Sequence, residues 1–274
     1  MGWFWVARRG IGSGMSTLDL PWYGPVHLGV HNFGAMIGIP RWCKVGVRPH
    51  GGHFVVASDR RPVHVASAER WTHYRFGWDA RVARLFRHFS VDDRITLGAG
   101  DVVVDIGANV GEFSIGAAAR GAHVLAIEGD PTVFKCLSEN ASGTPNVTPK
   151  QGLVWKANEE LTFYSAPAKA DSSIFQPTTS QSVTEVRLQA HKLDDLAAHL
   201  DAIDLIKCDA EGAEPEVLEG ASDVLARTRQ IAIDTGPERM GQETGAECEA
   251  ILKSAGFKVT HSVRGRKITF GIRG

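Results

Sequence analysis

Residues 101–130 read DVVVDIGANVGEFSIGAAARGAHVLAIEGD, and this stretch decides the fold. Its apolar run at 102–106 is typical of a parallel strand that is buried on both faces. A glycine-bearing turn over 107–111 follows, and the Ala-rich segment 112–120 predicts a helix that ends at Gly121. The order of strand, turn and helix predicts the opening unit of a parallel α/β sheet.

A second strand, predicted over 123–127, ends at Glu128. Glycines in the preceding turn let the backbone approach a ligand closely. A carboxylate about 20 residues beyond the turn can accept hydrogen bonds from ribose hydroxyls. The unit therefore predicts a ligand that contains a ribose.

The nucleoside cofactors that would fit this unit differ in the charge of the group that would lie at the turn. A dinucleotide fold usually carries G-x-G-x-x-G, because its pyrophosphate rests on bare amides at a helix N-terminus. Here Asn109 replaces the middle glycine, and Asp105 stands directly before the turn. A carboxylate at that place disfavours pyrophosphate and favours the sulfonium and ammonium of S-adenosylmethionine. The residues favour S-adenosylmethionine over NAD or FAD, and a glycine-containing turn without a cofactor is the other alternative.

The composition is that of an ordinary globular protein. The chain has 274 residues, of which 43% are hydrophobic and 22% charged. It holds no run of about 18 apolar residues, and arginines follow the short apolar patch at the N-terminus, the reverse of a secretory signal. The cysteines lack C-x-x-C spacing and are expected to be reduced thiols. A cytoplasmic location is predicted.

The net charge of −1 conceals an asymmetry. Residues 1–100 hold 13 Lys+Arg and 6 Asp+Glu, a net of +7, so the remainder has 30 − 13 = 17 basic and 31 − 6 = 25 acidic residues, a net of −8. Six of the 7 tryptophans also lie in the first hundred residues. Such a segment suits anionic or sugar-like partners, although a solvated basic surface with packed tryptophans accounts for it equally. A patch compatible with a membrane interface comprises Trp3, Phe4, Trp5, Arg8 and Arg9.

The chain divides into two predicted domains, 1–95 and 96–274. The first, an accessory or substrate-binding segment, has a predicted hairpin around Gly51-Gly52 and a helical pattern over 67–89. In the second, strands predicted over 146–154, 202–209 and 230–234 extend the parallel sheet, 161–166 and 182–190 form an inserted hairpin, and 257–261 and 267–272 form an antiparallel tail. Helices are predicted after Asp130-Pro131, over 191–200, before Arg227 and over 243–255. The sum is a doubly wound, mostly parallel α/β sheet.

Two motifs together resemble a known family. VVVDIGANVGEFS (102–114) and LIKCDAEGAEPEVLEGA (205–221) are similar to the FkbM-type S-adenosylmethionine-dependent methyltransferases, whose pattern looks like D-x-G-A-N-x-G followed by K-x-D-x-E-G-x-E. The resemblance covers about 101–234. It departs from the family at Gly129, where members more often have Pro, and at Asp234, where they commonly have Glu.

The resemblance implies a Rossmann-like class I methyltransferase fold, with seven strands and an antiparallel C-terminal strand. The cofactor would lie across the carboxyl ends of the strands. Asp105 and the glycine turn would surround its methionine portion, Glu128 its ribose, and residues after the third strand its adenine. The expected cofactor contacts are Asp105, Gly107, Ala108, Asn109, Gly111, Phe113, Glu128, Gly129, Gln151, Gly152 and Asp209.

Charged residues at the end of the fourth core strand are the candidate catalytic groups. Transfer of a methyl group to an alcohol needs alignment and a base, because the alcohol has a high pKa. Asp209 is predicted to be the base or to orient the acceptor, with Lys207 tuning its charge and Glu211 contacting the substrate. The predicted acceptor contacts are Glu211, Glu214, Ser172 and Ser173. For Glu214, an interaction with the helix N-terminus is the alternative.

The predicted activity is O-methylation of a hydroxyl on a sugar, a glycan or a secondary metabolite. The alternatives are a NAD-dependent oxidoreductase and a non-catalytic cofactor-binding module. No metal is expected, although oxygen ligands at this strand end could bind Mg²⁺, and His73 or His88 could serve as the base instead. Nucleic acid is not an expected partner, since the catalytic segment is acidic. The oligomeric state stays open, and a homodimer is compatible with the sequence.

Overall fold

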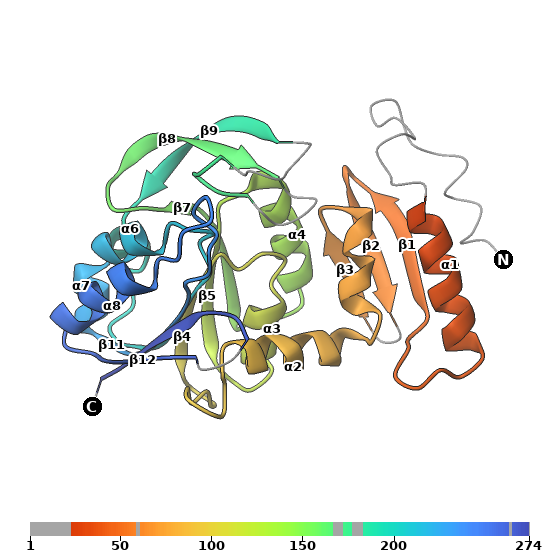
Figure 1. The fold of residues 1–274 in the computed structure, drawn as a ribbon, viewed down its shortest axis with the longest axis horizontal. Coiled ribbons are helices and arrows are strands. Elements are labelled where there is room, and N and C mark those ends of the chain that lie inside the picture. The colour runs from red at the N-terminus through yellow and green to blue at the C-terminus, as the bar shows by residue number, and fades with distance from the viewer. Residues whose placement is uncertain (1–22, 59–60, 167–171, 177–182, 263–264, 274) are drawn as a thin grey trace. The chain divides into compact units, whose positions relative to one another are not determined.

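A computed structural model describes residues 23–58, 61–166, 172–176, 183–262 and 265–273. The chain forms two compact units, Met1–Arg84 and Leu85–Gly274, and each is described by itself (Figure 1). The aromatic and basic patch predicted at the N-terminus lies outside the described residues. Among the helices that are described, none has the length and apolar character needed to cross a bilayer.

The first unit is built on a three-stranded antiparallel meander. Its strands are β1 (Val45–His50), β2 (His53–Ser58) and β3 (Arg61–Val65), in the order β1-β2-β3. The predicted hairpin is confirmed, since Gly51 and Gly52 both have positive φ, as a two-residue hairpin turn requires. Before the sheet comes α1 (Tyr23–Met36), and after it η1 (Ala68–Tyr74) and α2 (Trp78–His88).

Two sequence predictions for this unit were wrong. Helix α1 was not predicted, because its sequence YGPVHLGVHNFGAM is rich in glycine and histidine and lacks a clear apolar period. Tertiary contacts hold it instead: the side-chain amide of Asn32 exchanges two hydrogen bonds with the backbone of Val45, at 2.7 and 2.8 Å. The continuous helical pattern over 67–89 is divided into η1 and α2, because the chain passes through Gly77 at φ +86°.

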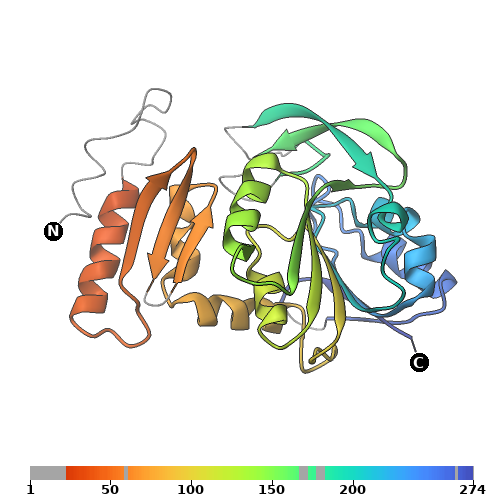
Figure 2. The same ribbon diagram turned by 180° about the vertical axis from the view of Figure 1, so that it is seen from behind.

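The second unit is a doubly wound sheet, which confirms the predicted fold class (Figures 1 and 2). Its seven strands run in the order β12-β13-β11-β10-β4-β5-β6. The five strands from β11 to β6 are parallel, and β13 pairs antiparallel with both β11 and β12. The strand bounds are β4 (Val102–Ile106), β5 (His123–Glu128), β6 (Val147–Gln151), β10 (Ile203–Cys208), β11 (Thr228–Asp234), β12 (Lys258–His261) and β13 (Ile268–Ile272).

Helices cover both faces of this sheet, and its central strands β4, β5, β10 and β11 are mostly buried. Helices α3 (Glu112–Ala118) and α4 (Pro131–Ala141) lie on one side, and α6 (Glu214–Glu219), α7 (Ser222–Ala226) and α8 (Gly245–Ser254) on the other (Figures 1 and 2). The single helix predicted up to Arg227 is divided into α6 and α7 at Gly220, where a Cβ would lie 2.2 Å from the carbonyl oxygen of Trp155. The helix predicted over 191–200 shrinks to α5 (Leu193–Leu196).

The predicted inserted hairpin is present and forms its own sheet. Strands β8 (Glu159–Ser165) and β9 (Thr184–His191) pair antiparallel, and the short β7 (Leu153–Val154) adds to β9 in parallel. The strand predicted over 146–154 is therefore shared between β6 and β7, which belong to different sheets. The connection between β8 and β9 contains Ser172 and Ser173, two of the predicted acceptor contacts.

The two compact units divide after Arg84, earlier than the predicted boundary near residue 95. Aromatic packing explains the difference. The rings of Phe86 and Phe89 lie edge-on to that of Phe113 in α3, with centroids 5.3 and 5.8 Å apart. The end of α2 is thereby part of the core of the second unit.

Candidate active site

The glycine turn after β4 crosses directly over the end of β10. Gly107 has φ +66°, and a Cβ added there would lie 1.9 Å from the carbonyl oxygen of Asp209. Gly111 has φ +91°, and its Cβ would lie 2.7 Å from the side chain of Leu137. Asn109 also has a positive φ, 53°, which asparagine tolerates better than most residues. Neighbouring protein groups thus leave no room for a side chain at either glycine. Contact of this turn with a ligand stays a prediction.

Beneath the turn lies a buried ion pair between the two sequence motifs. Asp105 is fully buried, and its Oδ1 lies 3.0 Å from Nζ of Lys207. Its Oδ2 accepts a hydrogen bond of 2.5 Å from the hydroxyl of Ser114. Nζ of Lys207 also donates to the carbonyl oxygens of Ile106 (3.2 Å) and Gly107 (2.8 Å). The ammonium therefore holds the turn in place from below.

The pKa of Lys207 reflects this arrangement. Burial alone would lower it, but the charges of Asp105 and Asp209 outweigh burial and raise it above the ordinary value. The lysine stays charged. Its closest carboxylate is that of Asp105, so the structure favours a positioning role for Lys207 beside the charge-tuning role predicted from the sequence.

Glu128 ends β5 with its carboxylate directed at the turn. Its Oε2 accepts the N–H of Asn109 and its Oε1 the N–H of Asp130, both at 2.9 Å. Burial raises the pKa of Glu128 to about 7, against the lowering effect of these two N–H groups. Each carboxylate oxygen can accept a second hydrogen bond. The side chain is thus placed and chemically able to receive ribose hydroxyls.

The predicted adenine-flanking residues adjoin Glu128. Gln151 ends β6 and pairs with Glu128 in the β5–β6 register, and the N–H of Gly152 donates to the carbonyl of Glu128 at 3.0 Å. Gly129 follows directly, half-buried. Ala108 and Phe113 are both buried, and the ring of Phe113 packs against that of Phe86 in α2. Contact with a cofactor stays a prediction for all of these residues.

The loop after β10 is held by Glu214. This side chain has no exposed surface: Oε1 accepts the N–H groups of Ala210 (3.1 Å) and Gly212 (2.9 Å), and Oε2 accepts the hydroxyl of Thr244 (2.9 Å). Burial raises its pKa to about 7. The geometry favours a structural role for Glu214 over the predicted substrate contact. Glu211, with φ 50°, is half-buried in the same loop.

Asp209 stands at the carboxyl end of β10. About a fifth (22%) of its side chain is exposed. Its Oδ1 is buried and accepts no hydrogen bond from the residues that the structure describes. A buried carboxylate oxygen without a donor loses solvation, so it favours a hydroxyl group that could donate to it. This is the property expected of a residue that orients an acceptor alcohol or removes its proton.

A histidine and an arginine join this strand end from other elements. Nη1 of Arg266 lies 2.5 Å from Oδ2 of Asp234 and 4.0 Å from Oδ2 of Asp209, and Nη2 lies 3.4 Å from Glu238. Nε2 of His88 lies 3.2 Å from Oδ2 of Asp234. Burial, with the charges of Asp209 and Asp234, raises the pKa of Glu238 to about 8.

The carboxylates of Asp209, Asp234 and Glu238 lie close enough together to bind a cation. The oxygens of Asp209, Asp234 and Glu238 lie within 4.8 Å of one another. The guanidinium of Arg266 already pairs with this group and supplies the positive charge there. The sequence did not single out Arg266 or Glu238. The one sequence signal for Arg266 was its place next to Gly265, between the two strands of the predicted antiparallel pair. The structure shows that the second of these strands, β13, lies beside β11.

The two serines that were predicted to contact substrate fasten the loop after β8. The hydroxyl of Ser172 donates to Oδ2 of Asp130 at 2.8 Å, and that of Ser173 donates to the carbonyl of Glu211 at 2.9 Å. Asp130 also receives the hydroxyl of Ser165 at 2.5 Å. The described part of this loop, 172–176, is thereby tied to both the α4 N-terminus and the β10 loop. Substrate contact by these serines stays a prediction.

The comparison with protein families supplies the identity of this fold. Residues 105–259, more than half of the chain, match the model described as the methyltransferase FkbM domain. The chain belongs to the FkbM methyltransferase family. The resemblance drawn from the two motifs is thus confirmed.

Curated relatives of this FkbM chain are distant. It is 26% identical over 135 residues, 49% of this chain and 55% of the relative, to the hexuronic acid methyltransferase AglP of Haloferax volcanii. It is 28% identical over 211 residues, 61% of this chain and 10% of the relative, to the AMB antimetabolite synthetase AmbE of Pseudomonas aeruginosa. The chain thus spans about half the length of the first relative and a tenth of the second.

Among solved structures, a similar one is the magnesium protoporphyrin IX methyltransferase of Synechocystis PCC 6803 with bound SAM. The TM-score is 0.43 at 17% identity, and the alignment covers 74% of this chain and 83% of that one.

Proposed function

We propose that this FkbM-family chain transfers a methyl group from S-adenosylmethionine to a hydroxyl oxygen of a sugar or a similarly hydroxylated metabolite. The observation that carries the proposal is the placement of two carboxylates at the same edge of one parallel sheet. Glu128 ends β5 beside the glycine turn. Asp209 directly follows β10, and its backbone carbonyl oxygen lies against Gly107 of that turn. Ligands of open α/β sheets bind at this edge.

The donor side of the site fits S-adenosylmethionine, which supplies the activated methyl group. Glu128 has acceptor capacity left for ribose hydroxyls after receiving two N–H groups. The turn holds no row of bare glycine amides for a pyrophosphate, because Asn109 occupies its centre and Asp105 lies beneath it. These features disfavour the alternative of a NAD-dependent oxidoreductase.

The acceptor side needs a group that takes the hydroxyl proton as the new C–O bond forms. We assign this role to Asp209, whose Oδ1 is buried without a donor among the described residues. Asp209 would take the proton of the acceptor hydroxyl, while S-adenosylmethionine would supply the methyl group by loss of its sulfur–methyl bond and leave as S-adenosylhomocysteine. Nη1 of Arg266 lies 4.0 Å from the other oxygen of Asp209 and places a positive charge beside it.

His88 is a second candidate for the base. Its Nε2 lies 3.2 Å from Asp234, so when Nε2 carries the proton of that contact, Nδ1 keeps the lone pair. A histidine oriented by a carboxylate is a common general base. Two substitutions distinguish Asp209 from His88 as the base. Asp209→Asn removes only the first base, and His88→Gln only the second.

Two observations support a uronic acid as the acceptor: the name of one relative and the charge of Arg266. The Haloferax volcanii relative is named a hexuronic acid methyltransferase. Arg266 has half of its side chain exposed, 50%, beside the proposed base, so its guanidinium can also meet a substrate carboxylate. We therefore place uronic acids first among the sugars to be tested, with neutral sugars as the comparison.

The test is transfer of a labelled methyl group from S-adenosylmethionine to a panel of uronic acids, neutral sugars and hydroxylated metabolites. We expect a labelled O-methyl product, which alkaline treatment distinguishes from a methyl ester. Asp209→Asn should lower kcat at least about 100-fold, as loss of a general base does, and leave the affinity for S-adenosylhomocysteine within about twofold. Full activity of Asp209→Asn would overturn the assignment to Asp209. Failure to bind S-adenosylhomocysteine at all would overturn the proposed function.

A further inference from the structure

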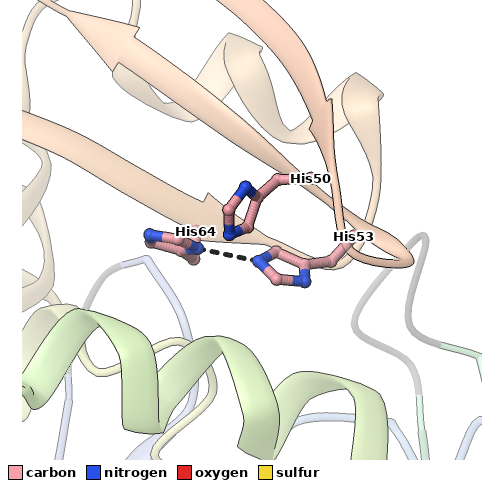
Figure 3. A group of neighbouring side chains, drawn as sticks. All are labelled: His50, His53 and His64. Carbon is pink, nitrogen blue, oxygen red and sulfur yellow. Dashed lines mark hydrogen bonds between the residues drawn. The ribbon is translucent and has the colours of Figure 1, made fainter. Parts of the chain in front are cut away.

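The sheet of the first unit carries three histidines on one face. His50 and His53 are direct partners in the β1–β2 register, on either side of the turn. Val55 follows His53 by two residues, so both point to the same face, and its partner in β3 is His64. One imidazole from each strand thus reaches the same patch (Figure 3).

The ring nitrogens of this histidine trio (His50, His53 and His64) converge. Nε2 of His53 and Nδ1 of His64 are hydrogen-bonded at 2.7 Å. One nitrogen from each of the three rings lies within 4.8 Å of the other two. A hydrogen bond between two ring nitrogens requires that one of them keeps its lone pair. A ring nitrogen with a lone pair is also the form that binds metal ions.

The trio lies close to the geometry of a tetrahedral metal site. Zinc–nitrogen bonds of about 2.05 Å at tetrahedral angles place two ligand nitrogens about 3.3 Å apart. The nitrogens of His53 and His64 would have to separate by about 0.6 Å from their present hydrogen bond. The imidazole of His50 would have to move inward, and His50 is exposed and can rotate, whereas His53 is buried (2% exposed) and fixed.

We propose that the histidine trio binds a divalent transition-metal ion of the zinc class through three imidazoles. Nitrogen ligands disfavour Mg²⁺ and Ca²⁺, which prefer oxygen. The strands Val45–His50, His53–Ser58 and Arg61–Val65 contain no Asp, Glu or Cys, so they supply no fourth ligand. The fourth position could be taken by water, by an anionic ligand or by a residue outside these three strands.

Such an ion would join all three strands at one end of the sheet. His50 ends β1, His53 begins β2 and His64 lies near the end of β3. An ion held only by the folded arrangement stabilises it against unfolding. The site therefore predicts that the first unit gains stability when the metal is added. This inference does not depend on the methyl acceptor or on the catalytic assignments.

The experiment uses the full chain, treated with a chelator and then titrated with Zn²⁺ in a calorimeter and with Co²⁺ in a spectrophotometer. We expect one equivalent of Zn²⁺ per chain, a rise in melting temperature, and the strong visible absorption of tetrahedral Co²⁺. His50→Gln and His64→Gln should each weaken binding at least about 100-fold, while circular dichroism in chelator shows that both still fold.

Two controls distinguish the trio from other ligands. His199→Gln removes an exposed histidine that lies outside the metal-compatible groups of the described residues, and it should bind as the unaltered chain does. Cys43→Ser removes the one cysteine of the first unit. The proposal is wrong if no saturable binding occurs, if both trio variants bind Zn²⁺ as tightly as the unaltered chain, or if Cys43→Ser abolishes binding.

Discussion

With Glu128 as the proposed ribose contact, its raised pKa should make cofactor affinity depend on pH within the neutral range. Burial sets this pKa at about 7. The ribose hydroxyls of the cofactor donate hydrogen bonds, so they need the carboxylate form. Binding therefore favours loss of the proton and lowers the pKa in the complex. Affinity for S-adenosylhomocysteine should rise as the pH rises through 7.

The magnitude follows from the fraction of chains that carry the carboxylate. With a pKa of about 7, roughly one-tenth of chains are ionised at pH 6 and roughly nine-tenths at pH 8. The dissociation constant should thus be about tenfold higher at pH 6, a difference of about 1.4 kcal/mol. The neutral variant Glu128→Gln should show no such dependence. It should also bind about 10- to 100-fold more weakly at pH 8, since its amide nitrogen cannot accept an N–H.

Isothermal titration with S-adenosylhomocysteine between pH 6 and 8, in two buffers of different ionisation enthalpy, measures both effects. Below pH 7 the apparent enthalpy should differ between the buffers, because binding releases protons. Glu214→Gln is the matched control. Its carboxyl also has a pKa raised to about 7, but it serves the β10 loop, so that variant should keep the pH dependence. A constant affinity for the unaltered chain, or an unchanged pH dependence in Glu128→Gln, would refute this reasoning.

Two further predictions concern the turn and its buried ion pair. Gly107→Ala should lower the free energy of unfolding of the second unit by about 3 kcal/mol or more, because its Cβ would lie 1.9 Å from the carbonyl oxygen of Asp209. Gly98→Ala, with nothing within 4 Å, should change it by less than about 0.5 kcal/mol in the same urea titration. Lys207→Met leaves Asp105 buried without its ammonium and should cost about 3–5 kcal/mol. Adding Asp105→Asn should recover part of that loss, and a strictly additive double variant would contradict the pairing.

The sequence predicts the second unit well because its signals are local. The run of Val102–Ile106, the glycines of the turn and the proline that begins α4 each specify backbone conformation within a few residues. The alternation of strands and helices then predicts a mostly parallel sheet, whereas the order of its strands comes from the structure. The first unit was predicted less well, because α1 is held by contacts such as that of Asn32 with Val45, which no local pattern reveals.

The site divides in the same way. Glu128 and Asp209 were singled out because each stands at the carboxyl end of a strand that the sequence predicts. The role of Ser172 could not be read, since its partner Asp130 is distant in sequence. Arg266 reaches Asp234 only because β13 returns antiparallel beside β11. Long-range pairing of side chains is the part of the site that a single sequence leaves undetermined.

The two motifs that identify the family contact each other directly in the folded protein. Lys207 and Asp105 are direct partners in the register of β10 and β4, so the second motif supplies the cation that the first motif needs. The same ammonium holds the carbonyls of the turn, while the backbone of Asp209 fills the space that a side chain at Gly107 would take. The glycine turn and the backbone of Asp209 are therefore in direct contact. A substitution at Lys207 should consequently change both the affinity for the cofactor and kcat, whereas one at Asp209 that keeps the backbone should change kcat alone.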